Sequence, residues 1–103
     1  MSNFLLELAE IIKSRKSEDT KKSYTSSLLS KGIIECLNKF EEESEEFVEA
    51  IKNNENIIHE SADVIYHFLV TLEARKIKII DVIKELEKRK KQSGHNEKKN
   101  RTK

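Results

Sequence analysis

The sequence predicts an all-α protein, a protomer of four helices that forms a helical bundle and is completed by dimerisation. The 103 residues contain no proline and only two glycines, whereas a β-sandwich or barrel needs many turn residues. Apolar residues recur three and four positions apart along most of the chain, as they do on one face of a helix. Hydrophobic residues make up 36% of the chain and charged residues 38%, so one copy buries a modest core that a second copy would complete.

Composition also narrows the class of protein. Residues 1–92 carry 16 Lys or Arg against 18 Asp or Glu, a net charge of −2, which argues against general nucleic-acid binding. The single cysteine, Cys36, excludes an internal disulfide and is expected to be a packed small hydrophobe. No apolar run of membrane-spanning length and no signal-peptide pattern occurs, so we expect a cytoplasmic protein with no membrane partner. Residues 1–91 are expected to form one domain, and residues 92–103 a basic, polar, disordered tail.

The first predicted helix covers residues 2–16, with Ser2 as its N-cap, and a polar loop follows at 17–22. Hydroxyls at 23–27 predict a short helical stretch capped by Thr25 or Ser26, and Gly32 predicts a break after it. The same hydroxyls and the amides of a helix start, with Lys31 nearby, would also suit a phosphate group. Both interpretations of this segment remain open.

Two long helices are predicted at residues 33–52 and 57–74, joined by an asparagine-rich turn, and a last helix at 79–91. The helix at 57–74 is the most apolar and should be the most buried. Of its histidines, His59 is expected at the surface, and His67 is expected to be hydrogen-bonded within the fold. The expected apolar stripes are, in the first long helix, Ile33, Leu37, Phe40, Phe47 and Ile51, and, in the second, Ala62, Ile65, Leu69 and Leu72.

Pairs of acids three residues apart lie on both long helices, Glu43 with Glu46 and Glu60 with Asp63. Residues so spaced are neighbours on one helix face, about 5–6 Å apart at Cβ. Two antiparallel helices would bring the four carboxylates together, and an all-oxygen site of this kind suits Mg²⁺ or Mn²⁺. Acid runs are also typical of solvated helix faces. Their position at the edge of the apolar stripes favours the metal site, because acids beside buried surface are costly.

A wider set of residues resembles the pattern of phosphoribosyl-ATP pyrophosphatases, which belong to the all-α nucleoside-triphosphate pyrophosphohydrolase superfamily. The resemblance covers roughly residues 4–90. The acid pattern is shared by the whole superfamily, whereas the Ser-Tyr-Thr segment and Lys39 indicate the histidine-pathway branch. The motif residues are Ser23-Tyr24-Thr25, Lys31-Gly32, Lys39, Glu42-Glu43-x-x-Glu46, Glu60-x-x-Asp63, Tyr66-His67 and Leu86-x-x-Arg89.

This resemblance implies hydrolysis of 1-(5-phosphoribosyl)-ATP to 1-(5-phosphoribosyl)-AMP and pyrophosphate, the second step of L-histidine biosynthesis, by a Mg²⁺-dependent homodimer. Water would attack directly, in line with the leaving group. One departure is Glu41, which stands where the family commonly has glycine. The implied roles are metal binding by Glu43, Glu46, Glu60 and Asp63, catalysis by Glu42, Glu43 and Glu46, and substrate binding by Tyr24, Thr25, Lys31 and Lys39.

Two other functions stay open on the sequence. A housecleaning pyrophosphatase of the same superfamily would act on ordinary or modified nucleoside triphosphates, although the Ser-Tyr-Thr segment and Lys39 argue against it. A non-catalytic helical dimer would carry the acids only as surface. Stabilisation by Mg²⁺ in a melting experiment separates a metal site from an acidic surface.

Overall fold

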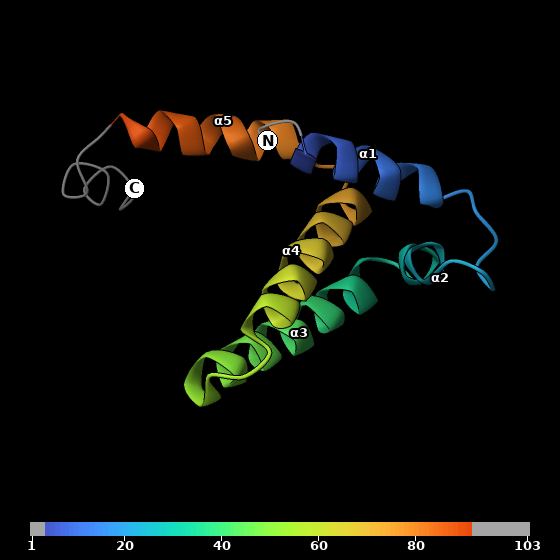
Figure 1. Cartoon of the computed structure of the whole chain (residues 1–103). Helices are drawn as coiled ribbons and strands as arrows, with labels where there is room; N and C mark the ends of the chain where they lie inside the picture. The colour runs from blue at the N-terminus through green and yellow to red at the C-terminus, as the bar shows by residue number, and fades with distance from the viewer. Residues whose placement is uncertain (1–3, 92–103) are drawn as a thin grey trace.

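The computed structural model describes residues 4–91, and this part of the chain consists of helices with no strand. The all-α prediction is therefore confirmed. Residues 4–91 form five helices instead of the four predicted, because the hydroxyl-rich stretch forms a separate helix, α2. Ser2 and the tail at 92–103 lie outside the described residues. The helices are α1 (Phe4–Arg15), α2 (Tyr24–Ser30), α3 (Ile33–Asn53), α4 (Ile57–Ala74) and α5 (Ile79–Lys90) (Figure 1).

Local sequence accounts for the boundaries of α2. Its N-cap is Ser23, and not Thr25 or Ser26 as predicted, since the Ser23 hydroxyl accepts a hydrogen bond from the amide of Ser26 at 3.1 Å. The predicted break at Gly32 is confirmed. Gly32 has φ +94°, a conformation that side-chain-bearing residues rarely adopt, and it separates α2 from α3.

The helices α3 and α4 form the main pair, joined by a short turn at 54–56 and lying side by side (Figure 1). Asn54 and Asn56 both take left-handed backbone conformations in this turn, φ 56° and 55°, which asparagine tolerates better than most residues. Helix α4 also contacts α1 and α2, and α1 contacts α5 near the far end of α4. Among the described helices, none is long and apolar enough to cross a membrane.

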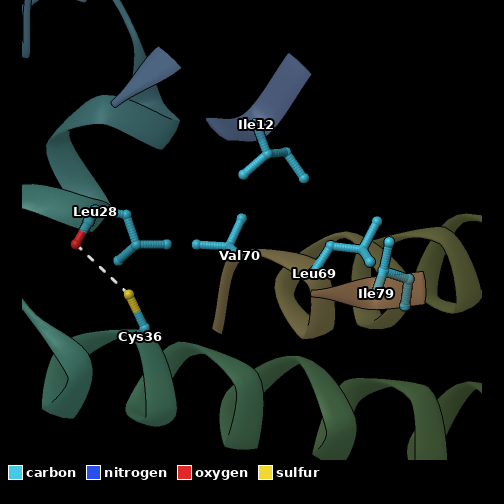
Figure 2. Packing of buried hydrophobic residues seen from close by; sticks show 6 residues of the cluster. All are labelled: Ile12, Leu28, Cys36, Leu69, Val70 and Ile79. Carbon is cyan, nitrogen blue, oxygen red and sulfur yellow. Dashed lines mark hydrogen bonds between the residues drawn. The ribbon is translucent and has the colours of Figure 1, made fainter. Parts of the chain in front are cut away.

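The core lies where α1, α2, α3 and α4 meet, and the start of α5 joins it through Ile79 (Figure 2). Cys36 is 1% exposed, and its thiol contacts the carbonyl oxygen of Leu28 at 3.7 Å, so the prediction of a packed cysteine is confirmed. Burial raises the pKa of this thiol, which keeps it protonated. The buried apolar residues of the cluster are Ile12, Leu28, Cys36, Leu69, Val70 and Ile79.

The predicted apolar stripes of the long helices are partly wrong. Leu37 and Ile51 of α3 are 41% and 50% exposed, and Ile65 of α4 is 48% exposed. Ala62 of α4 is exposed as well. Each helix has apolar residues on more than one face, so periodicity alone did not identify the face that packs within one chain. On α3, the residues with helical spacing on the face that packs are Cys36, Phe40, Glu43, Phe47 and Ala50.

Candidate active site

Glu43 lies in the middle of this packed face of α3, not on its flank as predicted, and is half-buried. Its carboxylate belongs to a cluster with Glu42 and Glu46, whose ligand oxygens lie within 4.8 Å of one another. A second cluster, on α4, joins Glu60 and Asp63 to His59, with its ligand atoms also within 4.8 Å. Each long helix therefore presents converging groups of the kind that bind a divalent cation.

The two clusters act on one another electrostatically. Burial of Glu43 raises the pKa of its carboxyl group, and the negative charges of Glu46, Asp63 and Glu60 raise it further. Two of those three charges come from α4. The carboxylates of the facing helices therefore repel one another, and the effect of His67, which lowers the pKa of Glu43, does not cancel this repulsion.

One buried carboxylate oxygen on each long helix has no partner. Oε1 of Glu43 and Oε1 of Glu60 are shielded from solvent and have no hydrogen-bond partner within the described residues. A buried carboxylate oxygen without a partner is unfavourable by about 1–3 kcal/mol or more. Carboxylate oxygens are the ligands that Mg²⁺ prefers, so the donor set of each cluster fits this ion.

Two clefts border the acid clusters. The first, of about 430 Å³, is an acidic cleft between the end of α3 and the start of α4. The second, of about 590 Å³, lies on the other side of Asp63 and brings two cations close to hydroxyls and the histidine of α4. We call it the hydroxyl cleft. Its lining residues are Arg15, Glu18, Lys22, Ser23, Tyr24, Thr25, Asp63, Tyr66 and His67.

Hydrogen bonds connect the hydroxyl cleft to the acids of α4. Nδ1 of His67 lies 2.9 Å from the carbonyl oxygen of Asp63, and Nε2 lies 2.9 Å from the hydroxyl of Tyr24. His67 is 6% exposed, so the prediction of a histidine hydrogen-bonded within the fold is confirmed. A second chain of bonds runs from Arg15 Nη1 to the Tyr66 hydroxyl, 3.3 Å away, and from Tyr66 to the hydroxyl of Thr25.

The four residues predicted to bind substrate differ in their exposure and in their distance from the hydroxyl cleft. Tyr24 lines the hydroxyl cleft and is 55% exposed, whereas Thr25 is 2% exposed and its hydroxyl is used by Tyr66. The Lys39 ammonium group lies 3.3 Å from Glu42, a hydrogen bond that raises the pKa of Lys39. Lys31 is exposed at the opposite end of α2 from Tyr24, about 10 Å along the helix.

The other hydroxyls of the α2 segment are engaged inside the fold. Ser23 caps the helix, and the hydroxyl of Ser26 donates to the carbonyl oxygen of Glu18 at 2.6 Å. The capped helix start expected for this segment is present, and the phosphate interpretation stays a prediction. The hydroxyl cleft that α2 helps to line is therefore formed by its side chains, not by a free loop of amides.

Several residues of this region were missed by reasoning from the sequence. Arg15 and Lys22 supply the positive charge of the hydroxyl cleft, but they lie in segments that read as a helix end and a polar loop. Tyr66 stood in the motif pattern without a role. His59 is at the surface as predicted, with its side chain 72% exposed, yet Nε2 lies 3.2 Å from Oδ2 of Asp63. Its position one turn before Asp63 was the available signal.

Comparison with known proteins finds one family and several relatives similar to this chain over most of its length. The profile of the family described as Phosphoribosyl-ATP pyrophosphohydrolase matches residues 5–90. A phosphoribosyl-ATP pyrophosphatase from Vesicomyosocius okutanii is 45% identical over 103 residues, with 98% of each chain covered. One from Ruegeria pomeroyi is 45% identical over 98 residues, 93% of each chain. The histidine biosynthesis bifunctional protein HisIE of Prochlorococcus marinus is 46% identical over 91 residues, 86% of this chain and 40% of that protein.

Proposed function

Because the chain belongs to the phosphoribosyl-ATP pyrophosphohydrolase family, we propose that it hydrolyses 1-(5-phosphoribosyl)-ATP to 1-(5-phosphoribosyl)-AMP and pyrophosphate. The family membership confirms the resemblance expected from the motif residues and makes the chain a hydrolase of histidine biosynthesis. The observation that carries the proposal is the pair of buried, unpartnered oxygens on Glu43 and Glu60. They lie on neighbouring helices, and Glu60 lines the acidic cleft, whereas Asp63, one turn further along α4, lines the hydroxyl cleft.

We propose Mg²⁺ as the ion, held by Glu43, Glu46, Glu60 and Asp63, with Mn²⁺ as a substitute. When bound, the ion would offset the charge of the phosphates and of the pyrophosphate that leaves. The carboxylates could not meet a polyphosphate without it, because like charges in a partly buried site repel. The raised pKa of Glu43 is consistent with a site whose negative charge a bound cation would neutralise.

Water is the proposed nucleophile, with a carboxylate of the α3 cluster as its general base. Glu42, Glu43 and Glu46 are the candidates, since a glutamate not fully used by the ion can accept a proton from water. Cys36 is an unsuitable nucleophile, because it is buried and burial raises the pKa of its thiol.

Positive side chains around the acids would bind the phosphates. Lys39 lies next to Glu42, and its charge also reaches Tyr24, as its lowering effect on the pKa of that tyrosine indicates. Arg15 and Lys22 line the hydroxyl cleft on the other side of Asp63. A long substrate with phosphates at both ends, such as phosphoribosyl-ATP, would thus meet cations at more than one point.

We further propose that the working unit is a homodimer. The face of α3 and α4 that is uncovered in one chain carries large apolar residues with helical spacing, and an identical face on a second copy would bury both. Replacing Ile65 with Glu should shift the protein from dimer to monomer in light scattering without abolishing its helical circular dichroism. The exposed apolar residues are Ile34, Leu37, Val48 and Ile51 on α3, and Ile58 and Ile65 on α4.

The function is tested by pyrophosphate release from fresh phosphoribosyl-ATP, with ATP and dUTP as comparison substrates, each with and without Mg²⁺. We expect metal-dependent release from phosphoribosyl-ATP well above that from the other two. Release mainly from the ordinary triphosphates would indicate a housecleaning enzyme instead, and no release by folded protein would leave a non-catalytic dimer. Capture of a covalent phosphoryl-enzyme would contradict attack by water.

A further inference from the structure

The hydrogen bonds around His67 determine where the hydroxyl hydrogen of Tyr24 points. Nδ1 of His67 lies 2.9 Å from the carbonyl oxygen of Asp63, and a carbonyl oxygen can only accept a hydrogen bond, so Nδ1 carries a hydrogen. In a neutral imidazole the other nitrogen, Nε2, is then an acceptor. The hydroxyl of Tyr24 lies 2.9 Å from Nε2 and therefore donates its single hydrogen to His67.

This arrangement leaves Tyr24 with only lone pairs to offer to a ligand. Its ring is part of the wall of the hydroxyl cleft, and the residue is 55% exposed. Burial of the hydroxyl and the nearby charges of Glu43, Glu42 and Asp63 raise its pKa, against a lowering effect of Lys39, so the hydroxyl keeps its hydrogen. An oxygen that can only accept disfavours a phosphate oxygen beside it and favours a donor, such as a hydroxyl group.

The neighbouring hydroxyls of Tyr66 and Thr25 are less available to accept a hydrogen bond from a ligand. The hydroxyl of Tyr66 accepts from Arg15 at 3.3 Å and shares a second hydrogen bond with Thr25. Thr25 is 2% exposed. Among these three hydroxyls of the cleft, Tyr24 combines solvent access with an acceptor that has no protein partner assigned to it.

We propose that Tyr24 is a specificity-determining residue whose hydroxyl oxygen accepts a hydrogen bond from a ribose hydroxyl in the ATP part of the substrate. This inference rests on the proposed function. The ATP ribose is joined directly to the α-phosphate, so it must lie next to the acids that would hold the metal. Tyr24 stands in that position, since His67 connects its hydroxyl to the backbone of Asp63 through two contacts of 2.9 Å and Asp63 lines the same cleft. Arg15 and Lys22 remain for phosphate, and Tyr24 would read the sugar.

The proposal is tested with Tyr24→Phe, measured on phosphoribosyl-ATP and on its analogues that lack the 2′- or the 3′-hydroxyl of the ATP ribose. One neutral hydrogen bond is worth about 3- to 10-fold in kcat/KM. We expect Tyr24→Phe to lose that factor on the parent substrate and to lose less than about twofold on one of the two deoxy analogues. Tyr66→Phe is the matched control, because its hydroxyl is already occupied; its loss should be the same on all three substrates.

A second measurement does not depend on activity. The ¹⁵N chemical shifts of His67, recorded on the full chain at about pH 8, where a histidine is ordinarily neutral, should show Nδ1 protonated and Nε2 unprotonated. The opposite tautomer would overturn the proposal, as would an equal loss by Tyr24→Phe on the parent and both analogues, which would assign the donor to water. If wild-type protein cleaves ATP but not phosphoribosyl-ATP, the proposed function fails, and the same comparison on ATP and its deoxy analogues still decides the role of Tyr24.

Discussion

Replacing Glu43 with Gln tests whether the acids on α3 and α4 form a cation site. The change keeps the size of the side chain and removes one charge from the middle of the packed face. Without metal, the wild-type protein holds an unpartnered carboxylate oxygen that is repelled by Glu46, Asp63 and Glu60. Relief of this strain should stabilise the metal-free variant by about 1 kcal/mol. For a domain of this size, that corresponds to about 4–8 °C in Tm.

The response to Mg²⁺ should change in the opposite direction. A ligand at 100 times its Kd stabilises the folded state by about 2.7 kcal/mol, which is about 10–20 °C in Tm for such a domain. We expect a shift of this order for wild-type protein and the loss of most of it for Glu43→Gln. Glu45→Gln is the matched control, because Glu45 is an exposed residue of the same helix that belongs to neither ligand cluster. It removes the same charge and should keep the shift.

The assay is thermal unfolding followed by circular dichroism, with MgCl₂ titrated against NaCl at equal ionic strength. The reasoning is refuted if Glu43→Gln melts with the same Mg²⁺-induced shift as wild-type protein. It is also refuted if NaCl reproduces that shift, because screening of surface charge would then account for it. A variant that is destabilised without metal would show that the carboxylate has a partner in the folded protein.

Three further predictions follow from burial and charge. In metal-free protein, Glu43→Gln should be more stable than wild type at neutral pH, and this difference should vanish below about pH 4.5, the usual glutamate pKa. The reason is that a raised pKa in the folded state destabilises the ionised carboxylate and not the protonated one. Thermal melts recorded across pH test this prediction. Leu69→Ala should lower the free energy of unfolding by about 2–5 kcal/mol in urea titrations, whereas Leu86→Ala, at a residue 58% exposed, should change it by less than about 1 kcal/mol. Lys39→Met should lower kcat/KM for phosphoribosyl-ATP by about tenfold or more. Lys31→Met should lower it less, since Lys31 lies at the end of α2 that is distant from Tyr24. An equal loss in the two variants would place both lysines at the phosphates.

The helices themselves were predictable from the sequence, since their signals are local. Absence of proline, the spacing of apolar residues and Gly32 determine where helices run and where α2 and α3 separate. The acid pairs were also local, because residues three apart on a helix must be neighbours. Burial of Cys36 followed from its place in an apolar segment.

What the sequence did not determine is which face of each long helix meets the other. Both helices have apolar residues on two faces, and only tertiary packing decides between them. That choice places Glu43 inside the α3–α4 contact and leaves Leu37, Ile51 and Ile65 exposed. It also brings the end of α1 to Tyr66, so that Arg15, 51 positions away, joins the site.

The chemistry of the site therefore has two origins. The sequence by itself determined the residue types and the local spacing of the acids, since the helical repeat fixes neighbours on one helix. Only the tertiary structure decided that one carboxylate oxygen on each of two neighbouring helices is buried without a partner among the described residues, and that His67 orients the hydroxyl of Tyr24. Contacts between residues more than 40 positions apart depend on the packing of whole helices, and helical periodicity does not predict them.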